Sequence, residues 1–358
     1  MRQRCLVPIG AIATVVMVVL LAQMPVAAQQ ARAGTKNQAL KAAAKPWALS
    51  RTVWGDPDLQ GIYTFSTDTP LERPARLAAK GTFTEAELAE LEKREAALHS
   101  AEDGAPRGGG VGTYNKFWTA TEKGRRADRT ALIVDPENGR QPQLTERAAK
   151  IKAAAAADLA TRRIGDNTLY NTWQDHPPYT RCVARPLPRI HQDYNHGVQI
   201  LQIPGYVILD YESMHDVRII PLDGRAHIHL DIAQWNGDPR GHWEGDTLVV
   251  DSTNFSDKMG FENSYEWGPS QAKLHLTERF TRVDAKIMNY VVTVDDPENW
   301  TKPFTFILPW RADDPIYQKP EDLYEFACHE GNYRMMEDSL LGSRALRAKQ
   351  AQVGTKKE

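Results

Sequence analysis

The chain has 358 residues, of which 41% are hydrophobic and 25% are charged. Its 44 basic and 46 acidic residues give a formal net charge of −2, which gives no reason to expect nucleic acid or an anionic membrane surface as a partner. Past the amino terminus, no segment is apolar over the ~20 residues that a spanning helix needs. We therefore expect a protein without a membrane anchor whose partner is a small molecule.

The amino terminus has the pattern of an export signal. Arg2 and Arg4 precede an apolar run from Leu6 to Leu21, and small residues follow up to Ala28. A basic segment, an apolar segment and a small-residue cleavage site, in that order, are typical of a signal peptide. We predict that residues 1–28 are removed near Ala28 and that the mature protein is periplasmic or secreted.

Two cysteines remain after this cleavage, Cys182 and Cys328, because Cys5 lies inside the signal. An oxidising compartment would let them form a disulfide, worth roughly 4 to 5 kcal/mol in the chain-entropy model. Two buried thiols or a nucleophilic cysteine are the alternatives. Neither cysteine belongs to a C-x-x-C pair, so we expect no metal site built on them.

The sequence divides into segments of different composition. Residues 29–46 are rich in Ala, Lys and Gln and predict a flexible leader. Residues 47–180 predict a mixed α/β flank, with strands over 59–65 and 130–134, a charged helix over 84–99, a glycine-rich loop over 104–112 and a helix from Thr145 to about Arg163. Residues 181–345 predict an antiparallel β domain, and residues 346–358 a tail.

Short strands joined by tight turns characterise the β domain. The candidate strands are 198–203, 206–212, 217–221, 247–252, 272–282, 287–295 and 304–308. The connections, such as Pro204-Gly205, are too short for parallel crossovers, which predicts an antiparallel sheet. The expected fold is mainly β: an antiparallel meander closing into a lipocalin-like barrel or a sandwich, with an α-helical amino-terminal flank.

Three motifs carry a resemblance to a known family. They are WGDPDLQG over 54–61, GHWEGDTLVVDSTNF over 241–255 and YEFACHEGNY over 324–333. With them the chain resembles a large family of secreted, mostly uncharacterised soil-bacterial proteins, which brings no activity to carry over. The chain departs from that family around residues 228–231, where prolines are usual, so a site built on His229 would be peculiar to this protein.

Titratable residues are concentrated between residues 211 and 231. His227 and His229 stand at i and i+2, which on a strand places both on one face, and Glu212 or Asp231 could complete a two-His-one-carboxylate metal site. The spacing is permitted but not diagnostic, and no H-E-x-x-H motif or EF-hand loop is present. A metal site of His227, His229 and Asp231 therefore remains an alternative, and we expect no cofactor.

The leading interpretation is a metal-free acid/base site. A histidine moves protons near neutral pH while a neighbouring carboxylate orients it. The candidate catalytic residues are His215, His227, Glu212, Asp251 and Glu278, and the candidate substrate-binding residues are Tyr211, Arg218, Arg279, Trp243 and His275. An arginine among them could hold an anionic group.

These features lead to one functional hypothesis and two alternatives. We expect an exported β-barrel that binds a small molecule and acts on it as a metal-independent lyase, isomerase or hydratase. The first alternative is a non-catalytic periplasmic binding module for a carbohydrate or a hydrophobic metabolite. The second is a metal-dependent hydrolase or oxygenase. The sequence does not identify the substrate or the oligomeric state.

Overall fold

The computed structural model describes residues 47–101, 127–164, 167–190, 195–259, 268, 270–313 and 323–354. Apart from Trp47, all of these belong to one structural unit, Ala48–Glu358. The expected signal peptide over 1–28, the leader over 29–46 and the glycine-rich loop over 104–112 lie outside the described residues.

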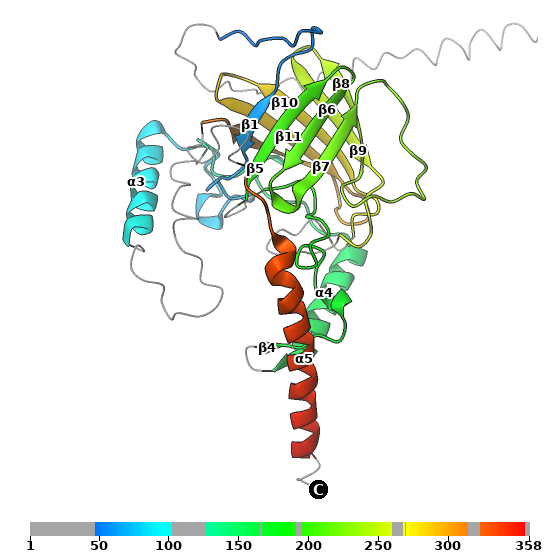
Figure 1. The fold of residues 1–358 in the computed structure, drawn as a ribbon. Coiled ribbons are helices and arrows are strands. Elements are labelled where there is room, and N and C mark those ends of the chain that lie inside the picture. The colour runs from blue at the N-terminus through cyan, green and yellow to red at the C-terminus, as the bar shows by residue number, and fades with distance from the viewer. Residues whose placement is uncertain are drawn as a thin grey trace, which may run out of the picture. The chain divides into compact units, whose positions relative to one another are not determined.

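A single antiparallel sheet dominates this unit (Figure 1). Its strands are β1 (Gly61–Thr64), β2 (Ile133–Asp135), β5 (Gly197–Ile203), β6 (Tyr206–Tyr211), β7 (Asp216–Pro221), β8 (Asp238–Glu244), β9 (Thr247–Thr253), β10 (His275–Arg282), β11 (Ile287–Asp295) and β12 (Phe304–Arg311). The order along the sheet is β7-β6-β5-β1-β12-β11-β10-β9-β8, and β2 pairs with β12 beside this path. The fold is therefore mainly β, an antiparallel meander nearly closed into a barrel, as the turn pattern predicted in part.

Local sequence explains both the turns and the two faces of the strands. Gly205 and Gly245 adopt φ values of +81° and +61° in the hairpins β5–β6 and β8–β9, a conformation that side chains disfavour. Along β10, β11 and β12 buried residues alternate with less buried ones. One face of the sheet is thus the core and the other faces outward.

Strand β8 was missed by the sequence prediction, because Pro239 and Gly241 are unusual inside a strand. Gly241 lies where the barrel closes. A Cβ atom there would come within 2.7 Å of Ile220 Cγ2 on β7 and closer still to Leu222 Cδ2. The missing side chain at Gly241 lets β8 approach β7, although the two strands form no ladder.

The connection between β7 and β8, residues 222–237, is long for a geometric reason. Neighbouring strands alternate in direction along the path of nine strands, so the first strand, β7, and the last, β8, run in the same direction. Two strands in the same direction need a crossover of a dozen or more residues. We call residues 222–237 the crossover loop.

The amino-terminal flank contributes to the same sheet. Strand β1 lies between β5 and β12, so a boundary at residue 180 does not separate the sheet from the flank. The flank also contains η1 (Ala75–Leu77), α3 (Glu85–Ala101), α4 (Glu146–Thr161), the pair β3 (Arg163–Ile164) and β4 (Asn167–Thr168), and η2 (Trp173–Asp175). Thr145 caps α4 as predicted, accepting a hydrogen bond from Ala148 N at 3.1 Å.

A carboxy-terminal helix, α5 (Cys328–Gly354), was not predicted and crosses the expected tail boundary at residue 345. Its side chains contact the residues on either side of η2: Ser343 Oγ accepts from Tyr170 N at 2.9 Å, and Ser339 Oγ lies 2.9 Å from His176 Nε2. In the part of the chain that the structure describes, no helix has the length and apolarity to span a membrane.

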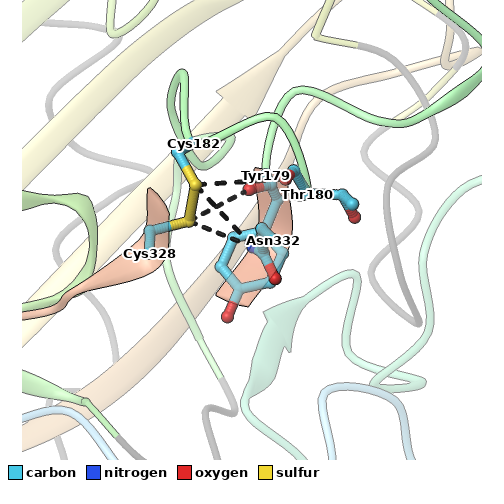
Figure 2. Close-up of a disulfide and its surroundings, with 5 residues drawn as sticks. All are labelled: Tyr179, Thr180, Cys182, Cys328 and Asn332. Carbon is cyan, nitrogen blue, oxygen red and sulfur yellow. Dashed lines mark hydrogen bonds between the residues drawn. A yellow bond between two sulfur atoms is a disulfide. The ribbon is translucent and has the colours of Figure 1, made fainter. Parts of the chain in front are cut away.

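A disulfide joins the start of α5 to the segment before β5. Cys328 bonds to Cys182, which is 146 residues earlier in the sequence, and Asn332 Nδ2 lies 3.1 Å from Cys328 Sγ (Figure 2). The pairing expected from the cysteine count is therefore present. It fastens α5 to the body that carries the barrel.

Aromatic side chains fill the interior of the barrel. Trp310 is almost fully buried, and its ring contacts those of Phe280 and Tyr290 at centroid distances of 5.3 and 4.8 Å. Phe65 and Tyr211 pack around the same tryptophan. Burial of such side chains stabilises the fold by about 1.5 to 3 kcal/mol each.

Candidate functional site

The structure distributes the predicted site residues over three places. Arg218 and Glu278 lie inside the barrel, Glu212 and His215 lie at the start of β7, and His227, Asp251 and His275 meet on the outer face of the sheet. The single cluster that the sequence predicted is therefore three separate groups of contacts.

The interior group is a buried ion pair with two hydroxyl partners. Arg218 Nη1 donates to Glu278 Oε1 at 2.9 Å, and Tyr290 Oη donates to the same oxygen at 2.6 Å. Ser252 Oγ accepts from Arg218 Nη2 at 3.1 Å. Burial lowers the pKa of Arg218, but the Glu278 carboxylate more than offsets this and the net shift is upward. Both charges are buried and paired with each other, so removal of either partner alone would leave an uncompensated charge in the core.

The second group surrounds the short helix η3 (Ser213–His215). Glu212 is buried and accepts hydrogen bonds from Gly197 N at 3.2 Å and Asn195 Nδ2 at 3.1 Å. His215 Nε2 accepts from the backbone N of Phe326 at 3.0 Å. Met214 and His215 have φ values of +68° and +49°, which non-glycine residues seldom adopt. His215 N also donates to Glu212 O at 3.4 Å. The Glu212 carboxylate is thus held by Gly197 and Asn195, whereas the His215 ring is held by Phe326.

The third group is built around Asp251 on the outer face of β9. Asp251 Oδ1 lies 2.8 Å from His227 Nε2, and Oδ2 lies 2.5 Å from His275 Nε2. The other ring nitrogen of His227, Nδ1, lies 3.0 Å from Asp238 Oδ2. We call His227, Asp238, Asp251 and His275 the outer cluster.

Strand register places the outer cluster. Asp251 is directly opposite Arg240 on β8 and Thr277 on β10, so His275 on β10 lies diagonally across from Asp251 on the same face. His227 comes from the crossover loop instead. The segment around His227 and His229 is not a strand, so the argument from their i and i+2 spacing does not apply.

The outer cluster is within reach of solvent. Of the His275 side chain 43% is exposed, against 27% of His227 and 10% of Asp238. The hydrogen bond from His275 is the largest of the effects that lower the pKa of Asp251, and the bond to Asp251 raises the pKa of His275. The pair therefore favours a carboxylate beside an imidazolium.

His227 contacts two carboxylates at once. Its Nδ1 lies 3.0 Å from Asp238 Oδ2 and its Nε2 lies 2.8 Å from Asp251 Oδ1. His227 thus holds the Asp251 oxygen that His275 does not contact.

The sequence prediction missed two residues of this region, Asp238 and Arg240. Asp238 Oδ2 also accepts from Ile228 N at 3.0 Å, and Arg240 Nη1 donates to Asp238 Oδ1 at 2.6 Å. Arg240 Nε donates to Ala226 O at 3.0 Å. The carboxylate thus orients His227 and fixes the crossover loop, but nothing in the local sequence distinguishes Asp238 from an ordinary turn residue.

The other predicted binding residues lie elsewhere. Arg279 shares the outer face with His275 and donates to Glu244 Oε2 at 2.6 Å. Trp243 packs against the core, and Tyr211 is buried with the Arg189 guanidinium over its ring at 4.2 Å. Tyr211, Trp243 and Arg218 therefore belong to the barrel interior.

The alternative metal ligands do not converge. His229 Nδ1 lies 3.2 Å from Asp231 Oδ2, both side chains are largely exposed, and both ring nitrogens of His227 face other carboxylates. Within the described ranges, no three His, Cys, Asp or Glu residues are grouped so as to hold a metal ion.

The chemistry available to the outer cluster is proton transfer. His275 is the most exposed member, and a carboxylate that accepts its N–H orients the ring and stabilises its protonated form. Comparison with protein-family models, curated proteins and solved structures found no match for this chain.

Proposed function

We propose that this chain is an exported, metal-independent enzyme of the lyase, isomerase or hydratase type, whose outer cluster exchanges protons with a small organic molecule. The observation that carries the proposal is the Asp251 carboxylate, whose two oxygens each contact the Nε2 atom of a different histidine. An ordinary exposed His–carboxylate pair, such as His242 and Glu244 at 3.3 Å, has only one imidazole.

His275 is the acid/base in this proposal. Its neutral form takes a proton from carbon, and the imidazolium returns that proton to another carbon in an isomerase or to a departing hydroxyl oxygen in a lyase. In the second case the C–O bond breaks with its electron pair on oxygen, so that water leaves and a C=C bond forms. Asp251 stabilises the imidazolium, while His227 and Asp238 act as positioning residues.

Two further features fit the proposal. The barrel belongs to an architecture, lipocalin-like in outline, that presents residues from many strands on rigid elements. The Cys182–Cys328 disulfide fits an oxidising compartment, as export would require.

Deuterium exchange tests the proposal without knowledge of the product. A panel of hydroxy acids, keto acids and sugar acids is incubated in D₂O with the mature protein, and loss of each C–H signal is followed by proton NMR. We expect the wild-type protein to exchange a C–H proton of at least one compound. The exchange rate should fall by about 10²- to 10⁴-fold in Asp251→Asn.

His242→Gln is the matched control, because His242 is an exposed histidine beside a carboxylate on β8. We expect His242→Gln to catalyse deuterium exchange at the wild-type rate. Stabilisation of the imidazolium by Asp251 has a second readout, since Asp251→Asn should also move the pH profile of the residual exchange to lower pH. A panel without any exchange, or exchange untouched by Asp251→Asn, would refute the acid/base role.

A further inference from the structure

The crossover loop exposes three large apolar side chains within six residues. Leu230 is 75% exposed, Ile232 52% and Trp235 36%. Single exposed apolar residues are common on protein surfaces, but a group of them on one short segment marks an interaction site more often. We call Leu230, Ile232 and Trp235 the apolar platform.

The loop that carries the apolar platform is fixed by hydrogen bonds. Asn254 Nδ2 donates to His229 O at 2.9 Å, with Ile228 O and Ile232 O also in reach, and Gln234 N donates to Asn254 O at 2.7 Å. Asn254 has a φ value of +58°, a conformation that its neighbours must maintain.

Packing adds a further restraint at the end of the loop. Gly237 lies so close to Phe255 that a Cβ atom would come within 2.7 Å of the Phe255 ring. The backbone is therefore held in one conformation while the apolar platform remains exposed.

The apolar platform adjoins the outer cluster. His227 is three residues before Leu230 in the same loop, and Asn254, which holds the loop, is three residues after Asp251. Trp235 is likewise three residues before Asp238. Three residues of chain span at most about 10 Å, so each end of the platform lies that close to a member of the outer cluster. A small molecule of about this length can bridge the platform and the outer cluster.

We infer that Leu230, Ile232 and Trp235 bind an apolar ring or alkyl chain of the molecule whose polar end exchanges a proton at the outer cluster. The inference rests on the proposed function and adds the substrate class: an organic molecule with an apolar group up to about 10 Å from the reacting carbon. The fixed loop lowers the entropy cost of binding, because the apolar side chains are presented before the ligand arrives.

Binding of anilinonaphthalenesulfonate, an aromatic probe that fluoresces in apolar surroundings, tests the platform directly. We expect the mature wild-type protein to bind it and Leu230→Ser/Trp235→Ser to bind at least about tenfold more weakly. The matched control is Trp173→Ser/Leu341→Ser, which removes an exposed tryptophan and an exposed leucine from η2 and α5. The control should change the affinity by less than about twofold, since sites without shared contacts act independently.

A second measurement guards against misfolding of the variant. In the wild-type protein, addition of the probe should shift the methyl NMR signal of Ile232 and leave that of Ile219 unchanged. No binding, equal loss of affinity in both double variants, or a shift at Ile219 instead of Ile232 would overturn the inference.

The two proposals fail in distinguishable ways. Asp251→Asn should bind the probe as the wild type does, because Asp251 is outside the platform. If Asp251→Asn abolishes deuterium exchange but Leu230→Ser/Trp235→Ser binds the probe as tightly as the wild type does, only the inferred substrate class is wrong. If exchange is insensitive to Asp251 while the platform variants lose the probe, the platform binds a ligand but the acid/base role is wrong.

Discussion

His227 Nε2 lies 2.8 Å from Asp251 Oδ1, although His227 comes from the crossover loop and Asp251 from the middle of β9. The contact fixes the carboxylate that also accepts from His275. It thereby connects a loop residue and two strand residues through one carboxylate on the outer face of the barrel.

The pKa of His275 should depend on Asp251. The hydrogen bond to Asp251 is the main cause of its upward shift from 6.5, so Asp251→Asn should bring the titration midpoint back toward 6.5 or below. Proton NMR of the histidine ring signals over pH 5 to 9 measures this. An unchanged midpoint in Asp251→Asn would show that the two groups do not interact in solution.

The same shift predicts a pH dependence of stability. Because folding raises the pKa of His275, its stabilising contribution is complete below the unfolded value near 6.5 and is lost as pH rises through the folded value. The unfolding free energy of the wild type should therefore be higher than that of His275→Gln, and this difference should be larger at pH 5.5 than at pH 9. The difference should stay below about 1 kcal/mol, since solvent screens so exposed a pair.

Urea unfolding of both proteins at the two pH values measures this difference. His242→Gln, on the neighbouring strand, controls for the loss of an exposed histidine. A larger gap at pH 9 than at pH 5.5 would reverse the sign and contradict the assignment.

The ion pair in the barrel interior should act as a unit. Arg218→Met or Glu278→Met alone leaves an unpaired buried charge and should cost about 3 to 5 kcal/mol of unfolding free energy. The double variant removes both charges and should cost much less than the two single changes together. Guanidinium unfolding of all four proteins measures the coupling, and additive losses would mean that the pair contributes nothing beyond its separate side chains.

Barrel closure should depend on the absence of a side chain at Gly241. Gly241→Ala would place a Cβ atom against Leu222 and Ile220 and should cost about 1 to 3 kcal/mol. Gly342→Ala in α5 is the control: no atom lies within 4 Å of its Cβ position, and alanine favours a helix by up to about 1 kcal/mol. Equal thermal unfolding midpoints for the two variants would argue against tight closure between β7 and β8.

The Cys182–Cys328 disulfide leads to predictions about the unfolding free energy and about cleavage of the expected signal peptide. The mature protein, denatured without reductant, should show no free thiol, and Cys182→Ser/Cys328→Ser should lose up to about 5 kcal/mol because the bond closes a loop of 146 residues. Thiol titration and intact mass measure this on protein from a periplasmic fraction. One free thiol would indicate that Cys5, and with it the export signal, had been retained.

Much of the fold could be predicted from the sequence because hairpins are local. Alternation along β10 and β11 and turn residues such as Gly205 and Gly245 fix strands and their antiparallel pairing within a few residues. Strand β8 was not predicted because Pro239 and Gly241 are unusual inside a strand, and the need for Gly241 arises only where β8 approaches β7. Helix α5 was not predicted because its first turns contain Gly331 and exposed residues such as Tyr333.

The outer cluster could be predicted only in part. His227, Asp251 and His275 were singled out by residue type, but Asp238 was not, and the sequence grouped these residues with His215 and Glu278. Alternation along a strand predicts which face each residue occupies, so the sequence could predict that Glu278 and His275 lie on opposite faces of β10. The fold of the crossover loop was not, because it depends on long-range bonds from Asn254 and Asp238.

Deuterium exchange by the wild type and by Asp251→Asn, compared with His242→Gln, tests the central claim most directly. The outer-cluster mechanism predicts exchange of a substrate C–H that falls about 10²- to 10⁴-fold in Asp251→Asn and stays at the wild-type rate in His242→Gln. Equal rates in all three proteins, or equal losses in the two variants, would contradict it.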